Sequence, residues 1–329
     1  MKGSLIALDM GSSNTYIYQS GMGIVLEAPS VIALDTEKGK VKALGEDAKK
    51  LMGLAVEETE VISPIFEGNI ENENATKKML NGFLKKINYK NQAMVVSVPC
   101  GIENEKLIQL NKTLAYVGVG EVSFVESPIL TALGMGILSD TAPRFIINIG
   151  GGTTNISAVS SSGIIAGVNI NFGGQNIDSM LINQIEQKFG LRIGMLTAEK
   201  LKNQLASMFP EDRLCHVVNG RDVNTGRPRP LSVDAGSIYP SLEAFFDIIC
   251  NVALKLMAKL PPEVLAEINR SGVYVSGGVS KIAGLGDYLT EKLQIKTIID
   301  NTAEYSNVLG AGQLLNNKEM LKKVRINKR

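Results

Sequence analysis

Short apolar runs alternate with polar turns and amphipathic stretches along the whole chain. The runs are rich in Ile, Val and Leu, which predicts β-strands, because branched side chains suit a half-buried pleated surface. We expect strands at residues 5–8, 15–18, 24–26, 31–34, 94–98, 145–149, 156–159, 164–168 and 273–276, with 31–34 continuing the first sheet. Apolar residues three and four apart predict helices at Met79–Leu84, Leu107–Leu114, Ile177–Ile185 and Leu242–Leu256. This alternation is typical of an α/β fold.

Glycine and proline mark the expected ends of two of these helices. The helix that contains Ile177 is expected to end near Gly190, and the longest helix is expected to be closed by Pro261 and Pro262. No apolar stretch approaches the ~18 residues of a membrane span, and the first residues lead directly into a strand and not into a signal peptide. We therefore expect a soluble, intracellular protein.

One strand-and-turn pattern occurs twice. The segment from Leu5 to Thr15 reads LIALDMGSSNT, and the segment from Phe145 to Asn155 reads FIINIGGGTTN. Asp9 and Asn148 are equivalent points of the two copies, which predicts an internal duplication. Small residues at such a turn let backbone N–H groups converge on an anion, although a hairpin turn closed by glycine also fits either loop alone.

A third glycine pair makes a nucleotide cleft the better interpretation. Gly277 and Gly278 follow the strand that ends at Ser276, where backbone must come close to a ligand. The candidate phosphate-binding residues are Gly11, Ser12, Ser13, Asn14 and Thr15 in the first loop and Gly150, Gly151, Gly152 and Thr153 in the second.

Composition and charge exclude several classes of protein. The 34 basic and 33 acidic residues nearly cancel, so no nucleic-acid footprint is visible. Six basic residues lie in the last dozen positions, which favours a solvated helix end over attraction to a membrane or partner. A single histidine, His216, excludes multi-histidine metal sites and makes a Ser/His/Asp triad improbable. Neither a P-loop nor a Gly-x-Gly-x-x-Gly motif is present.

The three cysteines are far apart and lack Cys-x-x-Cys spacing. We expect Cys100, Cys215 and Cys250 to be reduced thiols that pack as small hydrophobic residues.

The order of the motifs resembles that of the actin, Hsp70 and sugar-kinase superfamily, and within it the MreB family of bacterial actin homologues. The resemblance covers residues 5 to about 316. It rests on the two loops and on the segments 23–31, 98–102, 220–228, 261–264 and 309–312. It implies an actin-like (ribonuclease H-like) α/β fold, duplicated and two-lobed, with a central nucleotide cleft.

The resemblance also implies a division into domains. The first lobe would comprise residues 1–145 with a C-terminal helix at about 308–325, and it would carry a small insertion subdomain at about 33–75. The second lobe would comprise residues 146–307, with an insertion subdomain at about 180–240.

The site residues follow from the same resemblance. The two loops would close on the β- and γ-phosphates of ATP or ADP, while Asp9 would hold Mg²⁺ through water and Asn148 would contribute weakly. The residues expected around the adenosine are Lys202, Gln204, Leu205, Ala206, Ser207, Gly277, Gly278, Val279 and Ser280.

Four positions depart from the family pattern, and each departure removes a negative charge from the nucleotide site. Ser127 stands where the family has the Glu that orients the attacking water, and Asn148 replaces the Asp that opens the second loop. Gln204 replaces the Glu that meets the ribose, and Asn155 replaces another Glu.

Glu126 could substitute for the missing water-orienting Glu, although adjacent residues of a strand point to opposite faces of the sheet. Ser127, Glu126 and Thr153 are therefore the catalytic candidates, and we expect ATP to be bound and hydrolysed slowly or not at all. The alternative is that the four substitutions are neutral drift and leave the nucleotide site intact.

The function implied by the resemblance is cytoskeletal. MreB proteins form filaments on the inner face of the cell membrane and position cell-wall synthesis, so the expected partners are further copies of the chain, the membrane surface and cell-shape and wall-synthesis proteins. The expected location is the cytoplasm, peripheral at the membrane. The loop at 85–90 would offer its lysines to anionic lipid, with Ile87 and Tyr89 as apolar tips.

Other functions stay open. One alternative is a small-molecule kinase on the same fold. Such an enzyme would need a carboxylate base, which only Asp9 could supply at the loops. The other alternative is a non-hydrolysing MreB-like scaffold. An Hsp70-like chaperone is disfavoured because the chain has no length for a substrate-binding domain.

Overall fold

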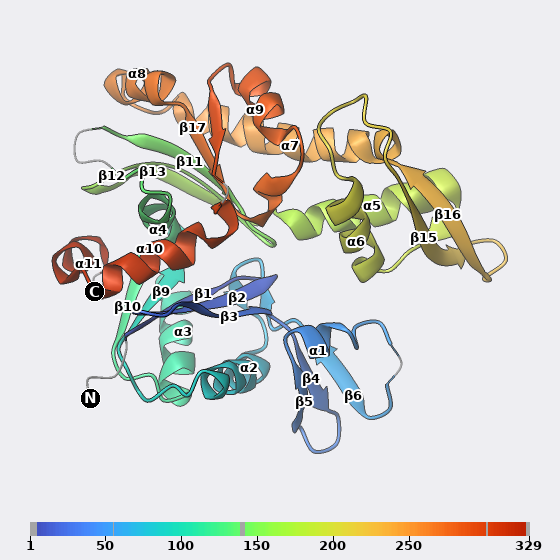
Figure 1. The fold of residues 1–329 in the computed structure, drawn as a ribbon, viewed down its shortest axis with the longest axis horizontal. Coiled ribbons are helices and arrows are strands. Elements are labelled where there is room, and N and C mark those ends of the chain that lie inside the picture. Colours follow the sequence, from blue (N-terminus) through green and yellow to red (C-terminus); the bar gives the residue numbers. More distant parts are fainter. Residues whose placement is uncertain (1–4, 55, 139–141, 301, 327–329) are drawn as a thin grey trace.

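A computed structural model describes residues 5–54, 56–138, 142–300 and 302–326. Two five-stranded sheets form two lobes, one above the other in Figure 1. The first sheet has the order β10-β9-β1-β2-β3, built from β1 (Ile6–Met10), β2 (Asn14–Gln19), β3 (Gly23–Pro29), β9 (Met94–Val98) and β10 (Val122–Glu126). The second has the order β13-β12-β11-β17-β18, built from β11 (Arg144–Ile149), β12 (Thr154–Ser160), β13 (Gly163–Ile170), β17 (Val273–Ser276) and β18 (Thr297–Ile299).

The two sheets repeat one topology. In each, three consecutive strands form an antiparallel meander, and two later strands add in parallel to the first strand of that meander. Asp9 pairs with Tyr16 across the first hairpin, and Asn148 pairs with Asn155 across the second. The expected duplication and α/β fold are therefore confirmed.

Helices α4 (Ser127–Gly134) and α10 (Ser306–Leu315) lie between the two sheets (Figure 1). They approach so closely that a Cβ at Gly310 would overlap the carbonyl oxygen of Leu130, and one at Gly134 would overlap that of Ser306. Glycine at both positions permits this contact at the junction of the lobes. The outer face of the first sheet packs on α2 (Glu73–Lys86) and α3 (Asn104–Tyr116), and α11 (Lys318–Val324) follows α10.

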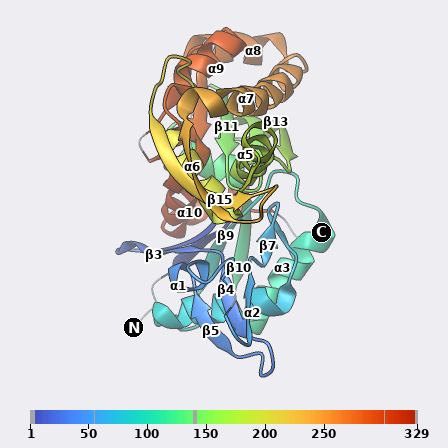
Figure 2. The same ribbon diagram turned by 90° about the vertical axis from the view of Figure 1, so that its right-hand side faces the viewer.

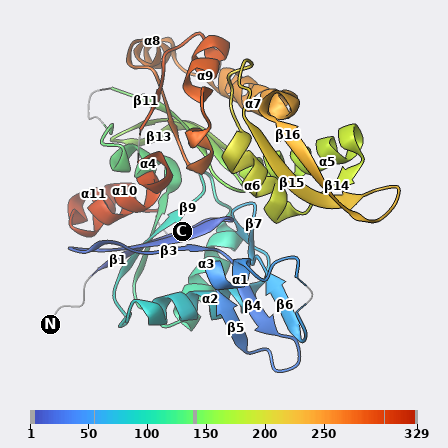
Figure 3. The same ribbon diagram turned by 45° about the vertical axis from the view of Figure 1, so that its right-hand side comes forward.

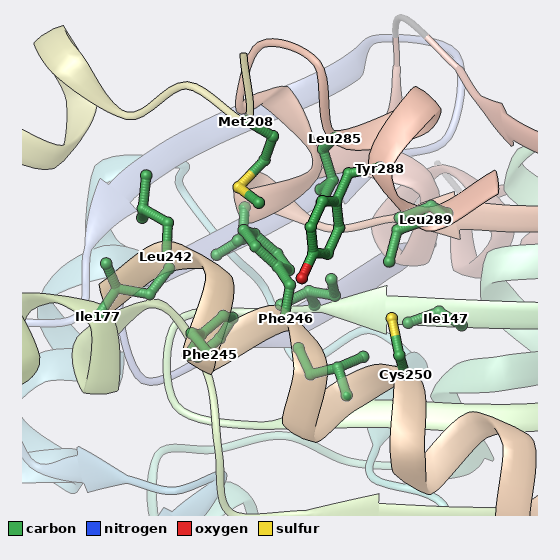
Figure 4. Close-up of a cluster of buried hydrophobic side chains, with 14 of the residues drawn as sticks. Ile147, Ile177, Met208, Leu242, Phe245, Phe246, Cys250, Leu285, Tyr288 and Leu289 are labelled. Carbon is green, nitrogen blue, oxygen red and sulfur yellow. The ribbon is translucent and has the colours of Figure 1, made fainter. Parts of the chain in front are cut away.

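The core of the second lobe is formed around α7 (Ala235–Met257), where Phe245 meets Phe246 edge-on (Figure 4). Phe245 also stacks on Phe172. The other helices of this lobe are α5 (Gly174–Phe189), α6 (Met195–Leu205), α8 (Pro262–Ser271) and α9 (Leu285–Leu293). The expected end of α5 is confirmed, because Gly190 caps it in the left-handed conformation. The expected end of α7 was wrong: α7 stops at Met257, and Pro262 begins α8 instead, as proline does at a first helical turn.

Helix α7 also corrects the expectation about membrane spans. By length and composition it is apolar enough to cross a membrane, the one such helix among the described residues. Its residues Leu242, Phe245 and Phe246 are fully buried in the lobe, so its apolar face is used by the core.

A small subdomain projects from each lobe, and both lie on the same side of the molecule (Figures 2 and 3). The first contains β4 (Ile32–Asp35), β5 (Val41–Leu44), β6 (Thr59–Ile62), α1 (Glu46–Lys49) and the hairpin of β7 (Ile65–Phe66) and β8 (Asn69–Ile70). The second contains β14 (Leu191–Arg192), β15 (Cys215–Asp222) and β16 (Pro228–Asp234). The strand expected at 31–34 therefore does not continue the first sheet, because β4 pairs with β5 and β6. The predicted domain bounds stay a prediction.

The cysteines differ in their surroundings. Cys250 is buried in the core and Cys100 is half-buried, whereas Cys215 is exposed on β15. The expectation that all three pack as small hydrophobic residues was wrong for Cys215, because alternate residues of β15 face solvent.

Candidate functional site

A cavity of about 510 Å³ opens between the lobes where the two sheets meet. The two glycine-rich loops and the ends of β1, β9 and β11 form its floor, and α6 and the short helix η1 (Gly278–Lys281) form one wall. A cavity of this size with converging backbone turns suits a small anionic ligand.

The two loops have the same internal geometry. The N–H of Gly11 donates to the carbonyl oxygen of Asn14 over 2.9 Å, and the N–H of Gly150 donates to that of Thr153 over the same distance. Each loop is thus a hairpin turn closed by glycine and also lines the cavity, so the two interpretations of the sequence are compatible.

The loops touch each other and a third element. A Cβ at Gly151 would overlap the hydroxyl of Ser13, and one at Gly152 would lie 2.5 Å from the hydroxyl of Ser12. The tip of the β7–β8 hairpin reaches the same point, where the N–H of Gly68 donates to Ser12 Oγ over 3.0 Å. Both lobes and the first small subdomain therefore meet at the loops.

Asp9 occupies the cavity floor at the end of β1. Loss of surrounding water raises the pKa of its carboxyl to about 6, and hydrogen bonds from Ser97 and Asn307 oppose that shift. A carboxylate beside the phosphate loops is the ligand type that Mg²⁺ prefers, and Mg²⁺ is commonly held by one or two carboxylates together with water and substrate phosphates. The Asp9 carboxylate thus fits such an ion. The described part of the chain has no cluster of three or more His, Cys, Asp or Glu.

Asn148 is part of a buried hydrogen-bond network. Its side-chain amide donates to Thr131 Oγ1 over 3.0 Å and to Asn307 Oδ1 over 3.1 Å, the amide orientation being assigned from this network. Thr131 and Asn307 lie on the two central helices, so Asn148 connects the second sheet to the junction between the lobes. Because its donor atoms are used in this way, only the side-chain oxygen of Asn148 is available to bound water.

The two catalytic candidates where β10 meets α4 lie in different surroundings. Ser127 lines the cavity, is 4 % exposed, and its hydroxyl has no hydrogen-bond partner among the described residues. Glu126 lies outside the cavity lining, and its Oε1 accepts the N–H of Gly101 over 2.6 Å. Glu126 is therefore occupied, while Ser127 faces the ligand space with a short neutral side chain. Thr153 also lines the cavity, in the second loop.

Asn155 lines the cavity and also connects the two lobes. Its Oδ1 accepts the N–H of Cys100 over 2.9 Å, which joins the second lobe to the turn after β9 in the first.

Lys202 of α6 is held in an ion pair. Its Nζ lies 2.8 Å from Asp178 Oδ1 and donates to the carbonyl oxygen of Gly174 over 3.1 Å. Burial raises the pKa of Asp178, and the Lys202 ammonium opposes the shift. Lys202 therefore reaches the start of α5, whose first N–H, that of Gly174, donates to the carbonyl oxygen of Gly150.

The third glycine pair requires glycine at its first position. Gly277 has φ +88°, and a Cβ there would overlap the carbonyl of Ile149 and lie 2.7 Å from Asn148 Oδ1. Gly277, Gly278 and Val279 all line the cavity.

Most of the residues expected at the site are brought together by the fold. The cavity lining includes Asp9, Gly11, Ser12, Ser13, Asn14, Ser127, Asn148, Gly150, Gly151, Gly152, Thr153, Lys202, Ala206, Gly277, Gly278 and Val279. Outside it lie Thr15, Glu126, Gln204, Leu205, Ser207 and Ser280. The hydroxyls of Thr15 and Ser280 bond inside the protein, to Ser30 and to the carbonyl oxygen of Gly277, and Leu205 belongs to the core.

Several lining residues were absent from the sequence-based set. They are Ser97, Glu199, Asn203, Lys281, Glu304, Ser306 and Asn307, with Thr131 directly behind. A signal for two of them was present, because Glu199 and Asn203 share a helix face with Lys202 and Ala206. Nothing in the local sequence marks Asn307, which lies 159 positions from its partner Asn148.

Comparisons with known proteins agree with this geometry. A family model described as MreB/Mbl protein matches residues 3–323. The chain is 31 % identical to the cell shape-determining protein Mbl of Bacillus subtilis over 324 residues, covering 97 % of each chain. It is 29 % identical to the cell shape-determining protein MreB of Escherichia coli, covering 94 % of this chain and 92 % of that one.

Solved structures show the same fold. MreB5 of Spiroplasma citri bound to AMPPNP superposes with a TM-score of 0.91 at 26 % identity, covering 97 % of both chains. The MamK double helical filament has a TM-score of 0.81 at 20 % identity, covering 94 % of this chain and 98 % of that one, which shows the fold alone.

Proposed function

The chain belongs to the MreB/Mbl family, and from this premise we propose that it is an ATP-binding, actin-like cytoskeletal protein whose filaments help determine cell shape. The observation that carries the proposal is the pair of equivalent loops, each closed by a glycine N–H, facing each other across one cavity. Support comes from the relatives, which are named cell shape-determining proteins, and from a neighbour of the same fold bound to AMPPNP and to ADP.

In this proposal the loops bind the phosphates through backbone N–H groups, and α6 with η1 holds the nucleoside. Asp9 would hold Mg²⁺ through water, and the metal would neutralise the phosphate charge. Hydrolysis needs a positioned water, and the cavity offers only the Ser127 hydroxyl at the place expected for a carboxylate. We therefore propose slow ATP turnover, in which bound ATP persists and filaments disassemble slowly.

A small-molecule kinase is less well supported. Such an enzyme needs a free carboxylate to deprotonate its acceptor. Of the carboxylates that line the cavity, Glu199 is ion-paired with Lys49 and Glu304 with Lys281, which leaves Asp9 in the place proposed for the metal.

Membrane contact and wall-synthesis partners are part of the proposal by family membership. The loop at 85–90 differs from the expectation in one respect: Ile87 and Tyr89 are half-buried and pack against the first core, and Tyr89 Oη donates to the carbonyl oxygen of Gln92 over 2.6 Å. The exposed residues of the loop are Lys85, Lys86, Asn88 and Lys90, and its charge comes from the three lysines, so contact would depend on charge and would weaken with salt. Flotation with phosphatidylserine vesicles at low and high salt, with and without Glu at these three positions, tests this surface.

Filament formation is tested by sedimentation and negative-stain microscopy at micromolar protein with ATP, with ADP and without nucleotide. Head-to-tail contacts are heterologous and give open polymers, so pelleting and visible filaments are expected with ATP. A protein that stays monomeric in all three conditions would contradict the proposal and favour the kinase.

A further inference from the structure

One face of α6 forms the nucleoside side of the cavity. Its lining residues are Glu199, Lys202, Asn203 and Ala206, spaced i, i+3, i+4 and i+7, which is the spacing of a single helix face. Gln204, the residue that the sequence favoured for the sugar, is off this face and outside the lining.

Three of the four lining side chains either have a partner within the protein or have no polar group. Glu199 pairs with Lys49 over 2.8 Å, and Lys202 pairs with Asp178 over 2.8 Å. Ala206 has no polar group. Asn203 also lines the cavity, and its side-chain amide makes no hydrogen bond within the described residues.

The position of Asn203 along the helix indicates which part of a nucleotide it meets. Lys202 marks the phosphate side, because it contacts Gly174, whose N–H bonds the second loop. Ala206 marks the opposite, apolar side, where Val279 and Ile282 also line the cavity and a bridge joins Ser207 to Ala283. Successive residues of a helix rise by about 1.5 Å, so Asn203 lies between these two ends, where a sugar would join phosphate to base.

We propose that Asn203 is the specificity-determining residue that binds the ribose hydroxyls of the nucleotide. The amide can donate to one hydroxyl and accept from the other, which matches a vicinal diol. This inference rests on the proposed function, because it presupposes a nucleotide in the cavity, and it assigns to Asn203 the contact that the sequence assigned to Gln204.

The test compares one chemical change at adjacent positions. Asn203→Leu and Gln204→Leu each replace an amide by an apolar group of similar size, and isothermal titration calorimetry then measures the affinity for ADP and for 2′,3′-dideoxy-ADP. The wild type should bind ADP about three- to tenfold more tightly than the dideoxy nucleotide, the range of an uncharged hydrogen bond. Asn203→Leu should bring the ratio near one without changing dideoxy-ADP affinity, whereas Gln204→Leu should keep the wild-type ratio.

Each other outcome has a distinct meaning. A preserved ratio in Asn203→Leu, a lost ratio in Gln204→Leu, or a wild type that does not distinguish the two ligands would overturn the assignment while leaving nucleotide binding intact. A changed preference between ADP and GDP in Asn203→Leu, with the ADP to dideoxy-ADP ratio unchanged, would assign Asn203 to the base instead and would also overturn it. A wild type that binds neither nucleotide would refute the proposed function itself. Thermal unfolding of both variants confirms that they are folded.

Discussion

Lys49 of the first small subdomain and Glu199 of the second lobe form an ion pair of 2.8 Å that joins the lobes at the edge of the nucleotide cavity. Lys49 lies on α1 and Glu199 on α6, which face each other on the same side of the molecule (Figures 2 and 3). Each side chain is 29 % exposed, so the pair is partly screened and contributes modestly.

Removing this ion pair should make nucleotide release faster. A pair of this exposure is worth ~0.2–1 kcal/mol, so Lys49→Met should accelerate ADP release up to about fivefold in stopped-flow measurements, and high salt should reduce the difference. The exchanged pair Lys49→Glu with Glu199→Lys should restore slow release. Release that is unchanged in Lys49→Met would show that the pair does not hold the cleft closed.

Gly151→Val should abolish nucleotide binding for a reason different from a direct clash with phosphate. The added side chain would collide with Ser13 of the opposite loop, so the two loops could no longer close together. Gly194→Val is a matched control, because nothing lies within 4 Å of the position of its Cβ. Calorimetry should show loss of ADP binding in the first variant and retention in the second. Normal affinity of Gly151→Val would contradict the arrangement of the loops.

Asp9 should make the stability of the nucleotide-free protein depend on pH. The pKa of its carboxyl is raised to about 6 in the fold, so the folded state binds a proton more readily than the unfolded chain does. The buried charge therefore lowers the free energy of unfolding fully above pH 6. This penalty is absent below about pH 4, where the carboxyl is protonated in both states. Asp9→Asn should therefore be more stable than the wild type by about 1–3 kcal/mol at pH 7.5, and the difference should disappear near pH 4. Urea unfolding at several pH values measures this, and a constant difference would exclude Asp9 as the cause.

Asn148→Asp should destabilise the protein and weaken magnesium-nucleotide binding. A carboxylate cannot donate to Thr131 Oγ1 or Asn307 Oδ1, and it would add a negative charge near Asp9, with which Asn307 also bonds. Loss of buried donors of this kind costs about 1–3 kcal/mol, measurable by urea unfolding. Asn148→Asp restores the acidic residue that the family has at this position, but this substitution by itself should not restore ATP turnover. A variant as stable as the wild type would mean that Asn307 reorients its amide.

Ser127→Glu should raise ATP turnover, because it places a carboxylate in the cavity where the unpartnered hydroxyl now lies. A group that positions the attacking water is commonly worth ~10²-fold, so phosphate release should increase by an amount approaching this value. Ser127→Gln has the same size without the charge and should not show the gain.

Glu126→Gln provides the complementary measurement. Because Glu126 already accepts the N–H of Gly101, neutralising it should leave the rate of phosphate release nearly unchanged. A large loss of turnover in Glu126→Gln, or none gained in Ser127→Glu, would show that Glu126 orients the water.

The sequence by itself determined most strands of the two large sheets and the duplicated loops between them. These features depend on local chemistry: glycine and small residues close the turns after β1 and β11, and Asp9 and Asn148 are fixed by their place at the ends of those strands. Gly277, which the sequence marked as a place where backbone comes close to a ligand, has φ +88°, a conformation that favours glycine.

Only the tertiary structure decided which side chains face the cavity and which partners they have. The bonds of Asn148 with Asn307, of Asn155 with Cys100 and of Lys49 with Glu199 join segments 55 to 159 residues apart, and no local pattern encodes such pairs. The rotation of α6 about its axis, set by burial of Leu201 and Leu205 in the core, turns Asn203 and not Gln204 toward the cavity. A shift of one residue on a helix changes direction by about 100°, so the face that meets the ligand was fixed by packing of the lobe and not by the motif.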